Sequence, residues 1–266
     1  MMKLFPRLFT MLTLSAALLP TAVLGQHLQS PEVHEDGRVS FRFRSSSAKE
    51  IRVEIERTED GIVKLTKDDK DNWVGTSRVL GPGIYEYGFV VDGVSQLDPR
   101  NRWIKKWYSL KSLFEVPGEP ALVTQQQQVP HGTLHHHTYR SDVTGTQRHV
   151  IVYTPANYHR NIDERYPVLY LLHGFGDDQT AWTEVGRADR VADNLIAAGS
   201  ARDMVIVMPH GHPEPLPYGD RPDNYTDRNN AAMVKEINHV LIPWIESRYR
   251  VAETPSERAI AGLSMG

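Results

Sequence analysis

The chain of 266 residues contains no cysteine. This absence excludes disulfide bonds, thiol nucleophiles and metal sites built on thiolates. An excess of positive charge is also lacking, because 30 basic residues stand against 33 acidic ones and the formal net charge is −3. The composition therefore gives no indication of a nucleic-acid partner. Hydrophobic residues make up 40% and charged residues 24%, which is ordinary for a globular protein of one large or two modest domains.

Long apolar runs are also lacking, except near the N-terminus. Residues 1–25 have the pattern of a secretory signal peptide, with Lys3 and Arg7 before an apolar stretch over 8–19 and small residues for cleavage at 23–25. A membrane anchor is the alternative, but the stretch is shorter than the ~20 residues that a transmembrane helix needs. We therefore expect a secreted or periplasmic protein that has no membrane association after the signal is removed.

Residues 27–120 alternate between apolar and polar side chains, as β-strands with one buried face do. The alternation is clear over 39–44 and 51–55, and a further strand is predicted over 84–91. Asp92 and Gly93 follow that strand and indicate a tight hairpin, because this pair accepts positive φ angles. Short strands with turns at this spacing predict a small β-sandwich.

Residues 121–130 contain a run of four glutamines and are predicted to be a linker. From residue 131 onward the pattern becomes that of an α/β domain. Three apolar runs, at 167–172, 204–208 and 259–261, predict buried strands, and the stretches 187–198 and 230–249 predict helices, the second with a kink at Pro243. Strands that alternate with helices predict a parallel sheet.

The last five residues, 262–266, form a G-x-S-x-G pattern directly behind the third apolar run. This pattern is typical of a nucleophile elbow, in which a strand turns sharply into a helix and exposes a serine on the turn. Ser264 is therefore the predicted nucleophile, to be activated by a histidine that an acidic residue orients. In the α/β-hydrolase fold, where this elbow occurs, both partners follow the serine in the chain. We therefore expect them beyond residue 266 and expect the 266 residues alone to be inactive.

The predicted strand over 167–172 is followed by His173-Gly174-Phe175-Gly176. In this fold the loop at that place donates one backbone N–H to the oxyanion hole, and the residue after the nucleophile donates the other. We assign these donations to Phe175 and Met265. His173 precedes the serine, so we expect it to make a structural hydrogen bond and not to act as the base.

Other side chains have two interpretations each. Trp182 either forms a wall of the acyl pocket or packs in the core, and His210 either lines the cleft or lies on an exposed loop; with Gly174 they are the candidates for the substrate pocket. The histidines at 135–137 are adjacent, so on a strand they point to opposite faces and do not converge on one ion. No metal and no cofactor are expected.

Taken together, these segments resemble the putative esterase family, which includes carbohydrate esterase family one (feruloyl and acetylxylan esterases), enterochelin esterases and esterase D. The resemblance covers residues 131–266 and is carried by 167–178, Trp182, 204–209 and 260–266. It implies an α/β-hydrolase fold, truncated after the elbow, with Ser264 as nucleophile. Residues 85–93 and 97–99 are similar to early-set immunoglobulin-like modules related to glycogen-binding domains, and such modules precede some of these esterases.

Three functions are compared. The leading hypothesis is a secreted serine carboxylic ester hydrolase that removes feruloyl or acetyl groups from plant polysaccharide through an acyl-serine intermediate. The first alternative is a siderophore esterase of the enterochelin type. The second is a carbohydrate-binding protein with an inert hydrolase remnant, in which Trp73, Trp103, Trp107 and Tyr108 form a stacking platform. For the chain as given, we also expect the strands around Val168 and Val205 to expose apolar surface.

Overall fold

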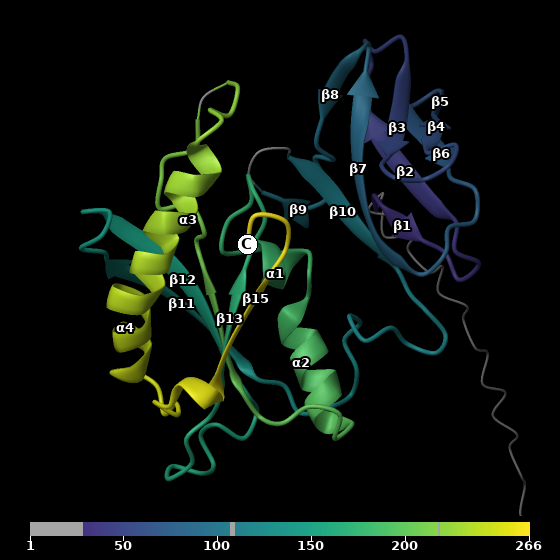
Figure 1. The fold of residues 1–266 in the computed structure, drawn as a ribbon. Helices are drawn as coiled ribbons and strands as arrows, with labels where there is room; N and C mark the ends of the chain where they lie inside the picture. The colour runs from purple at the N-terminus through teal and green to yellow at the C-terminus, as the bar shows by residue number, and fades with distance from the viewer. Residues whose placement is uncertain (1–28, 107–109, 218) are drawn as a thin grey trace, which may run out of the picture.

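The computed structural model describes residues 29–106, 110–217 and 219–266 (Figure 1). Two β-sheets form an N-terminal unit, and a third sheet with helices forms a C-terminal unit. The predicted signal peptide lies outside the described residues. Within the described ranges, no helix combines the length and the apolar character that a membrane span requires.

The N-terminal unit consists of two antiparallel sheets. The first has the order β1 (Glu32–Val33), β2 (Val39–Arg44), β6 (Asn72–Thr76) and β5 (Thr66–Lys67). The second has the order β4 (Ile62–Lys64), β3 (Ile51–Ile55), β7 (Gly83–Val91), β10 (Lys111–Val116) and β9 (Ile104–Lys105), with β8 (Val94–Gln96) paired to β7. The strands predicted over 39–44, 51–55 and 84–91 are therefore confirmed.

Side chains from both sheets meet in one hydrophobic core, so the unit is a β-sandwich. Phe41 of the first sheet contacts Tyr87 and Phe89 of the second, at ring-centroid distances of 5.0 and 6.5 Å. The hairpin after β7 has positive φ angles of 47° at Asp92 and 86° at Gly93, as its sequence predicts. The alternation of small apolar and polar residues is thus explained by one buried face on each strand.

The C-terminal unit is built on one mixed sheet of five strands. Their order is β11 (Thr133–Arg140), β12 (Gln147–Thr154), β14 (Val205–Pro209), β13 (Val168–Leu172) and β15 (Arg258–Gly262). The pairs β11–β12 and β12–β14 are antiparallel, whereas β13 is parallel to both β14 and β15. The carboxyl ends of the three parallel strands lie at one edge of the sheet, where open α/β sheets place their ligand sites.

Helices cover both faces of this sheet (Figure 1). One face packs against α2 (Ala188–Ala197), which follows the short α1 (Ala181–Glu184). The other packs against α3 (Tyr225–Glu236), a π-helical segment η1 (Ile237–Leu241) and α4 (Ile242–Glu246), and a short 3-10 turn η2 (Pro255–Glu257) precedes β15.

The long helix differs in its bounds and in its winding from the sequence-based prediction over 230–249. It begins five residues earlier, at Tyr225, and its distortion is the π-helical segment that precedes Pro243. Proline has no N–H to donate to the preceding turn, which accounts for a change of winding on its N-terminal side. Val234 on α3 is 59% exposed, whereas its neighbours Met233 and Glu236 are buried.

The strand that carries the elbow is not buried. β15 lies at the edge of the described sheet, and Ile260 is 62% exposed. The expectation that the strands around Val168 and Val205 expose apolar surface is wrong, because these side chains are 3% and 0% exposed. The apolar surface is found on β15 itself.

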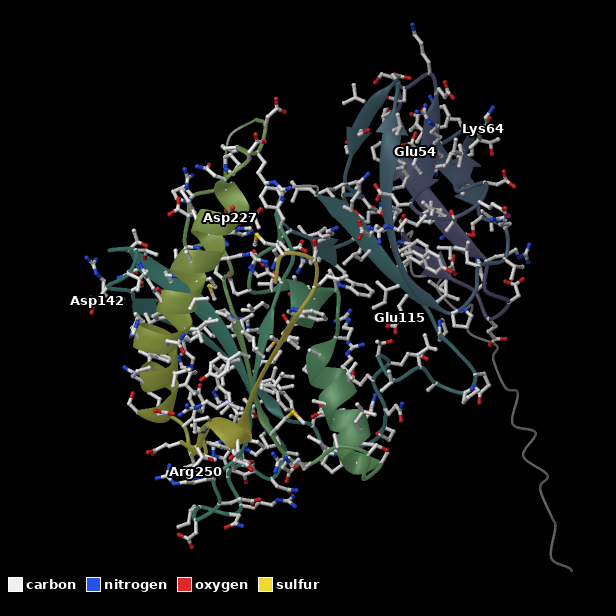
Figure 2. The ribbon with its side chains drawn as sticks, in the orientation of Figure 1. Glu54, Lys64, Glu115, Asp142, Asp227 and Arg250 are labelled. Carbon is white, nitrogen blue, oxygen red and sulfur yellow. The ribbon has the colours of Figure 1, made fainter. Side chains whose placement is uncertain are left out.

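The two units contact each other along α1 and α2. Asn194 on α2 donates hydrogen bonds of 2.8 Å to the backbone carbonyls of Val123 and Gln125, which holds the predicted linker on the helix. Glu115 on β10 lies toward α2 and is 3.7 Å from the guanidinium of Arg190 (Figure 2). The residues between the units thus follow a defined course over the surface of the C-terminal unit.

Candidate active site

Ser264 stands on a sharp turn at the carboxyl end of β15. Its φ angle is +58°, a left-handed conformation that a residue with a side chain adopts at a cost. The turn is fixed on both sides of the serine, because Leu263 N–H donates to the carbonyl of Leu172 at 3.2 Å and Gly266 N–H donates to that of Leu263 at 2.9 Å. This geometry is that of a nucleophile elbow.

Both glycines of the G-x-S-x-G pattern are required by close backbone contacts. A Cβ atom added at Gly262 would lie 2.3 Å from the carbonyl carbon of Gly266. One added at Gly266 would lie 2.6 Å from the carbonyl oxygen of Leu172. Such distances are too short for any Cβ, so the tight turn depends on the absence of side chains at these two positions.

The loop after β13 passes directly in front of the elbow. A Cβ atom added at Gly174 would lie 3.5 Å from the Cβ of Ser264 and 3.4 Å from the carbonyl oxygen of Leu263. The structure therefore brings the two sequence motifs, His-Gly-Phe-Gly and G-x-S-x-G, to the same place. Phe175 and Met265, the predicted oxyanion donors, each follow one member of this close pair in the chain.

His173 is a structural residue of the loop. Its side chain is buried, Nε2 accepts the N–H of Gly211 at 2.7 Å, and Nδ1 lies 2.9 Å from the carbonyl oxygen of Gly174. These partners place the proton on Nδ1. Burial lowers the pKa of His173, which favours this neutral form. Because both ring nitrogens are engaged with backbone, His173 is unsuited to act as the base for Ser264.

A second buried histidine holds the other end of the same loop. His212 Nε2 accepts the N–H of Gly176 at 3.1 Å, and Nδ1 is 3.0 Å from the hydroxyl of Tyr225 on α3. Burial lowers the pKa of His212 to about 3. The ring of Phe175 packs edge-on against both His212 and Tyr225, with ring centroids 5.7 Å apart in each case. The loop after β13 is thus anchored at Gly174, Phe175 and Gly176.

Met265 is held from α3. Asn229, which is 1% exposed, places its amide nitrogen 3.8 Å from Sδ of Met265 and 2.9 Å from the carbonyl oxygen of Gly211. The same side chain therefore connects the elbow to the loop after β14. This loop is also the partner of His173, so the two predicted oxyanion donors are positioned by one shared support.

A buried ion pair next to the loop after β14 was not predicted from the sequence. Arg148 on β12 and Glu236 at the end of α3 are 6% and 0% exposed, with Nε and Oε1 3.3 Å apart. Arg148 donates to the backbone carbonyls of His210 and His212, while Tyr139 and Ser141 donate to the carboxylate of Glu236 at 2.7 and 2.5 Å. In the sequence, Glu236 is only one of several charged residues of the helix predicted over 230–249, and nothing there indicates a buried partner.

The three candidates for the substrate pocket separate into two places. Gly174 and Trp182 line one cavity of 250 Å³, together with Leu263, the residue before the nucleophile. His210 lines a different cavity of 540 Å³ and its Nδ1 accepts the N–H of His212. Burial lowers the pKa of His210 to about 4. The structure therefore brings Trp182, and not His210, to a cavity beside the elbow; a second cavity of 250 Å³ lies on the other side of the turn and is lined by Met265 and Gly266.

The adjacent histidines of β11 point in alternate directions, as expected for a strand. His135 and His137 face inward and lie 3.0 and 2.5 Å from the hydroxyls of Thr154 and Tyr249, whereas His136 is exposed. Among the described residues, no group of three or more acidic, histidine or cysteine side chains is arranged to hold a metal ion.

Trp73 and Trp103, the two described members of the proposed carbohydrate platform, do not lie together. Trp73 is 6% exposed in the sandwich core, where its indole N–H donates to Ser45. The indole of Trp103 donates to the carbonyl of Glu184 on α1 at 2.8 Å, and Arg187 stacks on its ring at 4.0 Å. Trp107 and Tyr108 lie outside the described residues. Trp73 and Trp103 therefore serve the core and the contact between the two units.

The chain is similar to known proteins over most of its length. The family model "Putative esterase" matches residues 141–266. The chain is 30% identical over 241 residues to an endo-1,4-beta-xylanase/feruloyl esterase of Xylanibacter ruminicola. The aligned region covers 89% of this chain and 33% of that protein. It is 33% identical over 135 residues to the esterase Rv1288 of Mycobacterium tuberculosis, covering 50% of this chain and 27% of that protein. The chain thus spans about a third or less of the length of these curated relatives.

Among solved structures, the enterobactin esterase of Shigella flexneri is similar over 86% of this chain and 64% of that one, with a TM-score of 0.59 and 16% identity. At this identity the likeness concerns the fold alone. Together with the helices on both faces of the sheet and the serine on its elbow, it defines an α/β-hydrolase-type fold. Residues 141–266 belong to the putative esterase family, as the sequence resemblance implied.

Proposed function

We propose that the protein containing this chain is a secreted serine esterase that removes feruloyl or acetyl groups from plant polysaccharide. The observation that carries this proposal is the close approach of Gly174 to Ser264. It places a serine with φ of +58° directly behind a loop that His173 and His212 fix by accepting backbone N–H groups. Such a pre-organised arrangement suits acyl transfer, where charge develops on a carbonyl oxygen.

In the proposed reaction, Oγ of Ser264 attacks the ester carbonyl carbon as its proton passes to a base. The carbonyl oxygen becomes an oxyanion, which accepts hydrogen bonds from the N–H groups of Phe175 and Met265. When the tetrahedral intermediate collapses, the bond to the alcohol breaks and the alcohol leaves with a proton. Water then hydrolyses the acyl-serine by the same steps and releases the acid.

The feruloyl assignment draws support from the relative in Xylanibacter ruminicola, whose name joins a xylanase to a feruloyl esterase. The aligned 241 residues extend well beyond 141–266, so the similarity includes much of the N-terminal sandwich. The early-set immunoglobulin-like character of the sandwich and export by the segment 1–25 belong to the same proposal. A protein that acts on plant polysaccharide meets its substrate outside the cell.

The alternative substrate is a catecholate siderophore ester. Because the chain shares its fold with the enterobactin esterase, the experiment includes enterobactin as a substrate. The experiment uses the protein encoded by the complete open reading frame and compares kcat/KM on methyl ferulate, p-nitrophenyl acetate and enterobactin. We expect turnover of methyl ferulate or of the acetate ester, abolished by Ser264→Ala. A strong preference for enterobactin would overturn the polysaccharide assignment. Failure on every acyl ester would overturn the enzymatic one and favour the carbohydrate-binding alternative.

A further inference from the structure

The cavity beside the elbow is built by both units of the chain. Gly174, Trp182 and Leu263 of the C-terminal unit form one side, and Arg57, Glu86 and Lys105 of the sandwich form the other. Figure 1 shows why this is so, because β9, which carries Lys105, lies next to α1 and to the turn at the end of β15. Ser264 itself does not line the cavity, but Leu263, which precedes it in the chain, and Gly174, which faces it, both do. A substrate bound at Ser264 therefore has access to side chains of the N-terminal unit.

The volume and the walls of this cavity restrict what it can hold. Its 250 Å³ is larger than the ~150 Å³ that accommodates a benzene molecule in an engineered protein cavity. An acetyl group would leave most of this space unoccupied. A long alkyl chain would lie against the charged groups of the sandwich, which costs free energy when those groups lose water. A single aromatic ring with polar substituents matches both the size and the walls.

The two walls have complementary chemistry for such a ring. Trp182 offers an aromatic surface next to Ala181 and Val185, which suits stacking or edge contacts with a planar group. On the opposite side, Nζ of Lys105 lies 3.2 and 3.4 Å from the two carboxylate oxygens of Glu86, and both side chains keep part of their surface exposed. This pair presents hydrogen-bond donors and acceptors together.

Asp177 adds a third polar group from the C-terminal unit. It lines the same cavity, and burial raises the pKa of its carboxyl while the charge of Lys105 opposes that rise. Neighbouring hydroxyl and methoxy groups on a ring also combine donor and acceptor functions. A ring so substituted can satisfy the polar side of the cavity while its face contacts Trp182.

We infer that this cavity is the acyl pocket and that it selects hydroxylated aromatic acyl groups, with Lys105 and Glu86 of the sandwich recognising the ring oxygens. The inference rests on the proposed ester hydrolase function and adds to it the residues that set acyl specificity. The N-terminal unit is then part of the substrate site and not only a neighbour of it. Lys105 and Glu86 contact the far end of the acyl group, away from the reacting carbonyl.

The test compares two methyl esters that differ only at the ring, methyl ferulate and methyl cinnamate, on the protein from the complete open reading frame. The measurement is the ratio of their kcat/KM values, because a change in the ratio reports the ring oxygens alone. We expect Lys105→Met to lower the ferulate-to-cinnamate ratio about tenfold or more, since hydrogen bonds to charged groups contribute this much discrimination. Glu86→Gln, which keeps the shape of the side chain, should also lower the ferulate-to-cinnamate ratio.

Lys106→Met is the matched control. Lys106 neighbours Lys105 in the chain and pairs with Glu184 on α1 at 3.8 Å, but it does not line the cavity. Its substitution should leave the ratio unchanged, which separates recognition of the ring from a weakened contact between the units. A ratio within twofold of the wild-type value in both Lys105→Met and Glu86→Gln would overturn the inference. Absence of turnover of every acyl ester, methyl ferulate and p-nitrophenyl acetate included, by the wild-type protein would instead overturn the proposed function, and the inference with it.

Discussion

Gly174 and the side chain of Ser264 face each other across a space of about one methyl group, because a methyl group placed on Gly174 would lie 3.5 Å from the Cβ of the serine. The distance is that of an ordinary van der Waals contact, so the fold can accept the methyl group. The methyl group would nevertheless occupy space in front of the serine that an ester carbonyl must enter. The two motifs are separated by 90 residues in the sequence, and in the proposed reaction the position between them must stay empty.

We expect Gly174→Ala to separate stability from activity. The variant should unfold in urea within about 0.5 kcal/mol of the wild type, the range typical of substitutions that create no clash. Its kcat/KM on small esters should fall by at least tenfold, because the added methyl group obstructs the approach to Ser264. Gly81→Ala is the control, since a Cβ there has open space around it. Equal activity in the two variants would contradict the proposed position of the substrate carbonyl.

Gly262→Ala should instead destabilise the protein. The added Cβ would lie 2.3 Å from the backbone of Gly266, and a backbone atom cannot rotate away as a side chain can. We expect the free energy of unfolding to decrease by about 1–3 kcal/mol, as for other overpacked sites. Equilibrium urea unfolding measures the change against the Gly81→Ala control. A loss below about 0.3 kcal/mol would show that the elbow relaxes easily.

The left-handed conformation of Ser264 predicts a difference between two inactive variants. Both Ser264→Ala and Ser264→Gly remove the nucleophile, but only glycine adopts φ of +58° without a steric cost. Because that cost is about 1–2 kcal/mol, we expect the glycine variant to be more stable than the alanine variant by about 1 kcal/mol. Parallel thermal or urea unfolding curves provide the measurement. If the alanine variant were the more stable, the elbow would not be strained.

The buried ion pair predicts a large effect of a small change. Glu236→Gln leaves the guanidinium of Arg148 buried without its charge partner, and this situation costs about 3–5 kcal/mol. The loop that carries His210 and His212 should loosen, because Arg148 donates to both carbonyls. Asp227→Asn is the matched control, since Asp227 lies on the same helix and is exposed (Figure 2). Equal unfolding free energies for the two variants would show that the pair contributes little.

The two histidines of this loop predict sensitivity to acid. Burial lowers the pKa of His210 to about 4 and that of His212 to about 3, below the ordinary value of 6.5. The unfolded chain therefore binds more protons below pH 6.5, so their contribution to stability is complete above that pH and decreases as the pH falls toward 4. At about pH 5 the loss should be on the order of 2 kcal/mol per histidine.

Urea unfolding at neutral pH and near pH 5 measures this loss, and His212→Gln should reduce the pH dependence. The glutamine keeps a polar group near Gly176 but does not titrate. If the wild type and the variant lose the same free energy between the two pH values, His212 is not the source of the effect.

Much of the fold follows from local patterns in the sequence. The strands of the sandwich, the hairpin at Asp92 and the strands at 168–172 and 205–209 combine apolar periodicity with turn residues, and these are short-range signals. The close approach of Gly174 to Ser264 also follows, because both motifs end parallel strands that lie side by side. The structural role of His173 is confirmed by its two backbone partners.

Other features depend on contacts between distant parts of the chain. The Arg148–Glu236 pair joins residues far apart in sequence, and each of the two alone is an ordinary charged residue on an amphipathic element. The same holds for Lys105, whose place at the cavity depends on how the sandwich docks on α1. The exposure of Ile260 depends on which strands flank β15. A single sequence contains no signal for such pairings.

The hydrogen bond from Trp103 to the carbonyl of Glu184 makes the sandwich a capping device for α1. Helix ends leave carbonyl groups without internal donors, and here the donor comes from a different unit of the chain. The helix so completed carries Trp182 and forms a wall of the cavity. An N-terminal unit without a hydrogen-bond donor at this position would therefore leave that end of the helix uncapped, beside the wall of the cavity.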